Sequence, residues 1–77
     1  MKQMLINIAK AIVDNPDDVV VAEREDGEIT HLELSVAQSD MGKVIGKQGK
    51  IAKAIRALIK AASLKDNKHI VVDIIDK

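Results

Sequence analysis

The stretch Val44-Ile45-Gly46-Lys47-Gln48-Gly49-Lys50-Ile51 decides the fold. Apolar residues at helical spacing flank it, which predicts a short helix over 41–45 and a longer one over 50–63. Two glycines three residues apart in such a connection allow a tight turn and a close approach of the backbone to a ligand. The free N–H groups at the start of the second helix, together with Lys47 and Lys50, therefore predict a site for a phosphate group.

The segments before this stretch predict a helix and a hairpin. A first helix over 2–14 ends before Pro16, and its apolar residues recur at helical spacing: Leu5, Ile8, Ala9, Ile12 and Val13. Two strands over 19–25 and 29–37 flank Asp26-Gly27, a pair typical of a two-residue hairpin turn, which places Val21 opposite Leu32. Ser39 or Asp40 is then the expected N-cap of the helix over 41–45.

The segments after it complete a small α+β domain over residues 1–77. The helix over 50–63 has a predicted core face made of Ile51, Ala52, Ile55, Leu58, Ile59 and Ala62. A polar turn over 65–68 leads to a last strand over 69–75, with Ile70, Val72 and Ile74 pointing inward. The order is α-β-β-α-α-β, and a right-handed crossover makes the second and third strands parallel. We therefore expect a three-stranded mixed sheet with the helices packed on one face.

The charge is balanced overall but concentrated locally. Twelve basic and twelve acidic residues give a net charge of zero. Residues 42–65 nevertheless contain seven basic side chains and no acidic one, namely Lys43, Lys47, Lys50, Lys53, Arg56, Lys60 and Lys65. Local potential matters more than the total for binding an anion. The concentration of basic residues around the two glycines therefore favours a polyanionic ligand.

Several classes of function are excluded or disfavoured. The chain has no cysteine, and His31 and His69 are far apart, so we expect no metal, redox centre or cofactor. No nucleophile or acid–base pair is recognisable, which argues against an enzyme. The glycine spacing fits neither a P-loop nor a dinucleotide fingerprint. No apolar run approaches the roughly 20 residues that span a membrane, and we expect a cytoplasmic protein.

The run of two apolar residues, Gly-x-x-Gly, any residue and an apolar residue, set between two helices, resembles the signature of KH domains. The preceding helix and hairpin resemble the type II arrangement, and the segment 40–49 is most similar to the stand-alone bacterial KH proteins of the KhpA family. The resemblance implies that the loop clamps nucleic-acid backbone while unpaired bases lie against aliphatic side chains. The RNA-binding residues so implied are Gly46, Lys47, Gln48, Gly49, Lys43, Val44, Ile45, Lys50, Ile51 and Lys53.

The leading hypothesis is therefore non-enzymatic binding of single-stranded RNA with low sequence specificity. The resemblance further implies an RNA chaperone or post-transcriptional regulator linked to cell shape and envelope growth. It also implies self-pairing, or pairing with a larger KH-containing protein of the Jag/KhpB family. Two alternatives stay open: a binder of single-stranded DNA, and a protein-interaction module whose KH surface is vestigial.

A second line of small apolar residues runs along the helix over 50–63. At about 100° per residue it is distinct from the line of Lys53, Arg56 and Lys60. Alanine is the best helix former and fills surface positions for that reason alone. We favour a close-packed protein interface, whose predicted residues are Ala54, Ala57, Leu58, Ala61 and Leu64.

Overall fold

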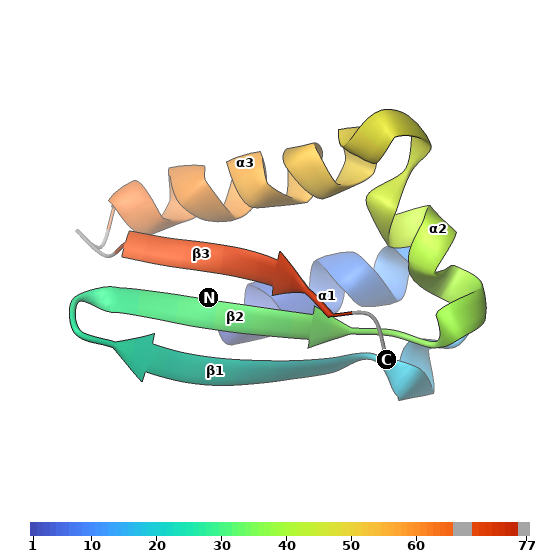
Figure 1. Ribbon diagram of the computed structural model, residues 1–77, viewed down its shortest axis with the longest axis horizontal. Helices are drawn as coiled ribbons and strands as arrows, with labels where there is room; N and C mark the ends of the chain where they lie inside the picture. Colours follow the sequence, from blue (N-terminus) through green and yellow to red (C-terminus); the bar gives the residue numbers. More distant parts are fainter. Residues whose placement is uncertain (66–68, 76–77) are drawn as a thin grey trace.

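The computed structural model describes residues 1–65 and 69–75. Its helices and strands follow the predicted order, and Figure 1 shows them from end to end: α1 Lys2–Ile12, β1 Val20–Asp26, β2 Ile29–Ser35, α2 Met41–Ile45, α3 Lys50–Leu64 and β3 His69–Ile74. Short 3₁₀ turns at Pro16–Asp18, Gln38–Asp40 and Lys47–Gly49 join them. Of the polar turn predicted over 65–68, residues 66–68 lie outside the described residues.

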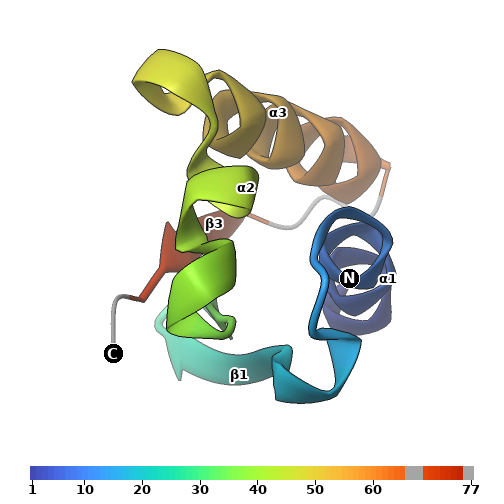
Figure 2. The same cartoon turned by 90° about the vertical axis from the view of Figure 1, so that its right-hand side faces the viewer.

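The sheet has the predicted mixed topology. β2 is central, pairs antiparallel with β1 and pairs parallel with β3. Helices α1 and α3 lie on the same side of the sheet (Figure 2), and α2 lies at the end where β2 stops (Figure 1). This arrangement is the α+β fold of a type II KH domain. It brings the connection between α2 and α3 to one end of the molecule.

The predicted register of the hairpin is wrong by two residues. Val21 lies opposite Leu34 rather than Leu32, because Asp26 pairs with Ile29 and the two turn residues are Gly27 and Glu28. Gly27 has a φ of 64° and is the first turn residue, the position where a two-residue hairpin of type II′ places glycine. The apolar residues still share one face, since a shift of two preserves the alternation of a strand.

The core between the sheet and the helices is aliphatic. Its largest fully buried apolar side chains are Leu5, Leu32, Leu34, Ile55, Ile59 and Val44. Val44 is the fully buried residue of α2, so this short helix is fixed to the core by a side chain two residues before Gly46. No helix among the described residues is long and apolar enough to span a membrane.

The core face of α3 differs from the predicted one. Leu58 and Ile51 were expected inside, but 51 % and 36 % of their surfaces are exposed. The buried line is Ala52, Ile55, Ile59 and Ser63. Ser63 is accommodated because its hydroxyl donates a hydrogen bond to the carbonyl oxygen of Lys60 at 2.8 Å. The hydrophobic pattern could not indicate a buried serine, and this shifted the predicted face away from the true one.

Candidate nucleic-acid interface

The loop between α2 and α3 depends on two glycines in different ways. Gly46 has φ 73° and ψ 178°, and a Cβ atom there would lie 2.6 Å from Cγ1 of Ile51. Gly49 has φ 76° and ψ 14°, and a Cβ atom there would meet no atom within 4 Å. Gly46 therefore lets the loop pack against the first turn of α3. At Gly49 the side of the backbone where a Cβ atom would lie faces open space.

Gln48 is the strained residue of the loop. It is the one non-glycine residue with positive φ in the described part of the chain, at 55°, and it is exposed. An L-residue in this left-handed region costs roughly 1–2 kcal/mol. Such strain is typical of sites where a backbone is held in place for a ligand.

Three lysines around the loop supply positive charge. Lys47, Lys50 and Lys53 are exposed. None has a carboxylate partner within 4.0 Å among the described residues. The N-terminus of α3 adds the positive end of a helix dipole at the same place. The loop and the start of α3 thus form a positive surface that no carboxylate of residues 1–65 and 69–75 compensates.

Lys43 was predicted to belong to this surface, but its charge is compensated. Its ammonium group forms an ion pair with Asp14 and lies 3.9 Å from Oδ1 of Asp40. The hydrogen bond to Asp14 raises the pKa of Lys43; burial acts against this, and attraction to Asp14 and Asp40 adds to it. Lys43 therefore faces two carboxylates of its own chain.

The predicted apolar contacts differ from one another. Ile45 and Ile51 expose 38 % and 36 % of their surfaces beside Gly46, so both are accessible to a ligand. Val44 is fully buried, and the prediction that it contacts RNA is wrong for this conformation. It supports the loop from the core instead.

Helix α3 and strand β3 lie side by side, and the line along which they meet, here called the seam, leads away from the loop. The predicted site did not include this seam. The N–H of Ile75 donates to the carbonyl of Leu34, so odd-numbered residues of β3 direct their backbone groups to β2 and even-numbered ones direct theirs to the free edge. The carbonyl of Val72 on that edge accepts a hydrogen bond from Nε of Arg56 at 3.2 Å. A guanidinium group thus lies over the strand edge.

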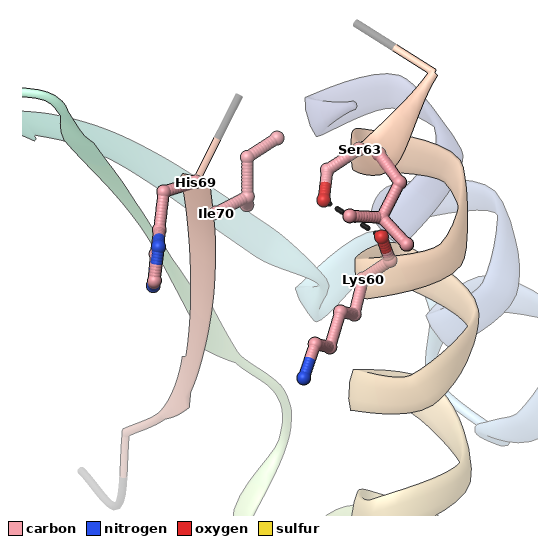
Figure 3. A pocket seen from close by; sticks show the side chains of 5 residues that line it. Lys60, Ser63, His69 and Ile70 are labelled. Carbon is pink, nitrogen blue, oxygen red and sulfur yellow. Dashed lines mark hydrogen bonds between the residues drawn. The ribbon is translucent and has the colours of Figure 1, made fainter. Parts of the chain in front are cut away.

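The seam ends in a hollow of about 190 Å³ near the C-terminus of α3. It is lined by Lys60, Ser63, Leu64, His69 and Ile70, and Figure 3 shows the ammonium group of Lys60 and the ring of His69 on its two sides. Sequence spacing placed Arg56 and Lys60 on one line of α3. The spacing could not predict which strand edge these two residues would face.

The predicted interface residues of α3 all lie on the surface. Leu58 and Leu64 expose 51 % and 68 % of their surfaces, which is unusual for large apolar side chains. At about 100° per residue, Ala54, Leu58 and Ala61 lie roughly 100–160° around the helix from Arg56 and Lys60. Most of the apolar line and the seam therefore occupy different sides of α3, with Ala57 and Leu64 bordering both.

Comparison with known proteins identifies the fold family. The family model described as KhpA/KhpB, KH domain, matches residues 2–74. The chain belongs to this KH-domain family. Its relatives within the family include the RNA-binding protein KhpA of Clostridium acetobutylicum, which is 61 % identical over 97 % of this chain and all of the relative.

Other relatives carry the same name at lower identity. The RNA-binding protein KhpA of Halalkalibacterium halodurans is 54 % identical over 99 % of this chain and all of the relative. That of Bacillus subtilis is 42 % identical over 99 % of this chain and 94 % of the relative. No solved structure gives a significant match. These relatives are thus named for RNA binding rather than for an enzymatic activity.

Proposed function

We propose that this protein binds single-stranded RNA on the Gly46–Gly49 loop and catalyses no reaction. The observation that carries the proposal is the exposed loop itself, where positive-φ glycines flank Lys47 and strained Gln48. It is supported by relatives that are named RNA-binding proteins. A phosphate group on the loop would accept hydrogen bonds from the N–H groups at the start of α3, and the positive charges of Lys47 and Lys50 would attract it.

The RNA strand would continue from the loop along the seam between α3 and β3. Lys50 and Lys60 are about 15 Å apart along the axis of α3, which allows a short run of nucleotides. Arg56 lies between them, and a guanidinium plane can stack on an unpaired base. The chain has no Phe, Trp or Tyr, so no base can stack on an aromatic ring. Contacts to phosphates carry no sequence information, and low sequence specificity is expected.

The loop assignment is tested by replacing Lys47 and Gln48 with Asp. A matched control exists because α1 begins with the same pair of residues, Lys2 and Gln3, which are also exposed. Affinity for a labelled, unstructured RNA is measured for both double variants by fluorescence anisotropy. We expect the loop variant to lose binding and the control, with the same change in net charge, to retain it. Equal affinities of the two variants would contradict the site.

The same assay separates RNA from DNA. A single-stranded DNA of the same sequence is added as competitor, and we expect weaker competition than from unlabelled RNA. Equal competition would favour a general binder of single-stranded nucleic acid, because the loop would then recognise only the phosphates.

We also propose that the apolar line of α3 is a protein interface. The exposure of Leu58 and Leu64 supports this, because large apolar side chains cluster on a surface chiefly where a partner covers them. The partner would be a second copy of this chain or a larger KH-containing protein of the Jag/KhpB type. The family model that groups KhpA with KhpB supports the second choice.

In the cell we propose a cytoplasmic role as an RNA chaperone or post-transcriptional regulator linked to cell shape and envelope growth. Its support is the resemblance to the KhpA family. Crosslinking of the protein to RNA in its own cells, followed by sequencing, should enrich transcripts for envelope growth. A set of transcripts unrelated to the envelope would contradict this role.

A further inference from the structure

Asp40 joins two distant parts of the chain at the entrance to α2. Its side chain is only 1 % exposed. The carboxylate accepts hydrogen bonds from the backbone N–H of Asp14 at 3.3 Å, from the backbone N–H of Asn15 at 3.0 Å and from Nδ2 of Asn15 at 3.0 Å. Ser39 or Asp40 was expected to cap α2; Asp40 does occupy the N-cap position, but its side chain makes no capping hydrogen bond to that helix.

Lys43 closes this arrangement from the other side. It lies one turn into α2, pairs with Asp14 and lies 3.9 Å from Asp40. The four residues Asp14, Asn15, Asp40 and Lys43, here called the clasp, therefore tie the segment after α1 to the first turn of α2. The contacts span 25 to 29 residues of sequence.

Helix α2 depends on such contacts for its direction. It has five residues, far fewer than an isolated helix needs for stability in water. Val44 anchors one side of it in the core, and the clasp holds its N-terminal end. Since Gly46 follows α2 directly, any rotation of α2 moves the loop relative to the start of α3.

We propose that the clasp is a positioning device, which sets the orientation of α2 and thereby the RNA affinity of the Gly46–Gly49 loop without contacting RNA. This inference rests on the proposed function of the loop. It assigns Lys43 a different role from Lys47 and Lys50, because the ammonium group of Lys43 is already satisfied by two carboxylates.

The direction in which one substitution changes the RNA affinity distinguishes the two possible roles of Lys43. If Lys43 binds a phosphate, Asp14→Asn removes a competing carboxylate and RNA affinity should rise. If Lys43 belongs to the clasp, Asp14→Asn weakens the clasp and affinity should fall, by roughly threefold or more for a coupling of this kind. Asp17→Asn is the matched control, because Asp17 is exposed, lies three residues away and makes no ion pair among the described residues. It should leave affinity unchanged or slightly higher.

Two further variants test the clasp, and the first of them leaves the net charge unchanged. Asn15→Ala removes one donor to Asp40 from an exposed residue and should also weaken binding. Lys43→Met should lower affinity while leaving the salt dependence unchanged; a phosphate contact would instead reduce the log–log slope by about 0.7. Folding of each variant is confirmed by far-UV circular dichroism before binding is measured.

A spectroscopic measurement distinguishes positioning from a general loss of stability. The chain has four glycines. In amide ¹H–¹⁵N spectra of the folded variants, Asn15→Ala and Asp14→Asn should shift the signals of Gly46 and Gly49 more than that of Gly27. If affinity and the loop signals stay unchanged while the double Asp variant of Lys47 and Gln48 loses binding, the clasp inference is overturned and the loop assignment stands. If that double variant also binds normally, the loop assignment itself is wrong.

Discussion

At the scale of single residues, the loop shows that identical residues can be required for different reasons. Gly46 and Gly49 look equivalent in the sequence, and the sequence predicted one role for both. In the structure Gly46 has a backbone conformation that essentially only glycine adopts, and it packs against Ile51. Gly49 is left-handed but faces open space. The distinction depends on the position of a side chain five residues away from Gly46.

Replacement of each glycine by alanine should separate these roles. Gly46→Ala combines backbone strain with a clash against Ile51, so we expect a loss of about 2–4 kcal/mol in the free energy of unfolding. Gly49→Ala should cost about 1–2 kcal/mol, the strain of one left-handed residue. Urea unfolding followed by far-UV circular dichroism measures both. Equal losses would show that packing against Ile51 does not decide the choice of glycine at position 46.

Asp40 predicts a specific dependence of stability on pH. Burial raises the pKa of Asp40, but hydrogen bonds from Asn15 and Asp14 and attraction by Lys43 outweigh it, so the net pKa lies below the ordinary value of 3.8. A carboxyl group with a lowered pKa stabilises the folded state above its unfolded pKa, and this contribution disappears as the pH falls through the folded pKa.

The destabilisation caused by Asp40→Asn should therefore be fully present above about pH 5 and shrink below about pH 4. Urea unfolding of the wild type and the variant at several pH values measures the difference in unfolding free energy. Glu28→Asn serves as a control, because Glu28 is an exposed turn residue that makes no ion pair in the described part of the chain. A difference for Asp40→Asn that stays constant with pH would contradict an ionised Asp40 in the clasp.

At the scale of elements, periodicity predicted every helix and strand and most of their ends to within two residues. Periodicity could not predict the register of the hairpin or the contacts between residues that are distant in sequence. A shift of two residues leaves the alternation of a strand intact, so the hairpin register could not be read from the apolar pattern. The clasp and the hydrogen bond from Arg56 to Val72 join residues that are distant in sequence, and no local pattern encodes them.

Helix α3 presents three different faces, and its apolar face can be tested alone. Ala61→Glu places a charge in the middle of the proposed interface. We expect a dimer of the wild type to become a monomer, measured by sedimentation equilibrium. Ala11→Glu is the matched control, because Ala11 is an exposed alanine on α1.

RNA binding provides the second measurement for this variant. Ala61 lies roughly 100–140° around α3 from Lys60 and Arg56, so a short RNA should still bind each chain of the Ala61→Glu variant. An unchanged mass of this variant would favour the explanation that alanine is present only as a good helix former.

At the scale of the whole molecule, charge is segregated although its sum is zero. Nine of the twelve acidic residues lie before α2, and the basic residues concentrate on the loop and α3. The molecule is elongated, at 34 × 21 × 18 Å, so charges at its two ends are farther apart than the Debye length of about 8 Å in physiological salt. RNA near the loop therefore encounters a positive surface rather than a neutral protein.

The salt dependence of binding measures that surface. If three or four phosphates are neutralised by Lys47, Lys50, Lys53 and Arg56, the slope of log affinity against log salt concentration should be roughly −2 to −3 for a single strand. Titrations in potassium chloride over a tenfold range of concentration give the slope. An affinity independent of salt would contradict a phosphate-based interface.

The separation of the two sides of α3 has a consequence for long RNA molecules. A partner copy seated on the apolar line would leave the seam beside β3 uncovered in both chains. The dimer would then carry two binding sites for a single RNA strand. Once one site is occupied, the second binds at the effective concentration set by the length of RNA between them. Such avidity can exceed the affinity of one site by 10²–10⁴ without any new contact. A domain with few strong contacts would thus prefer long transcripts, and would hold distant segments of one transcript near each other.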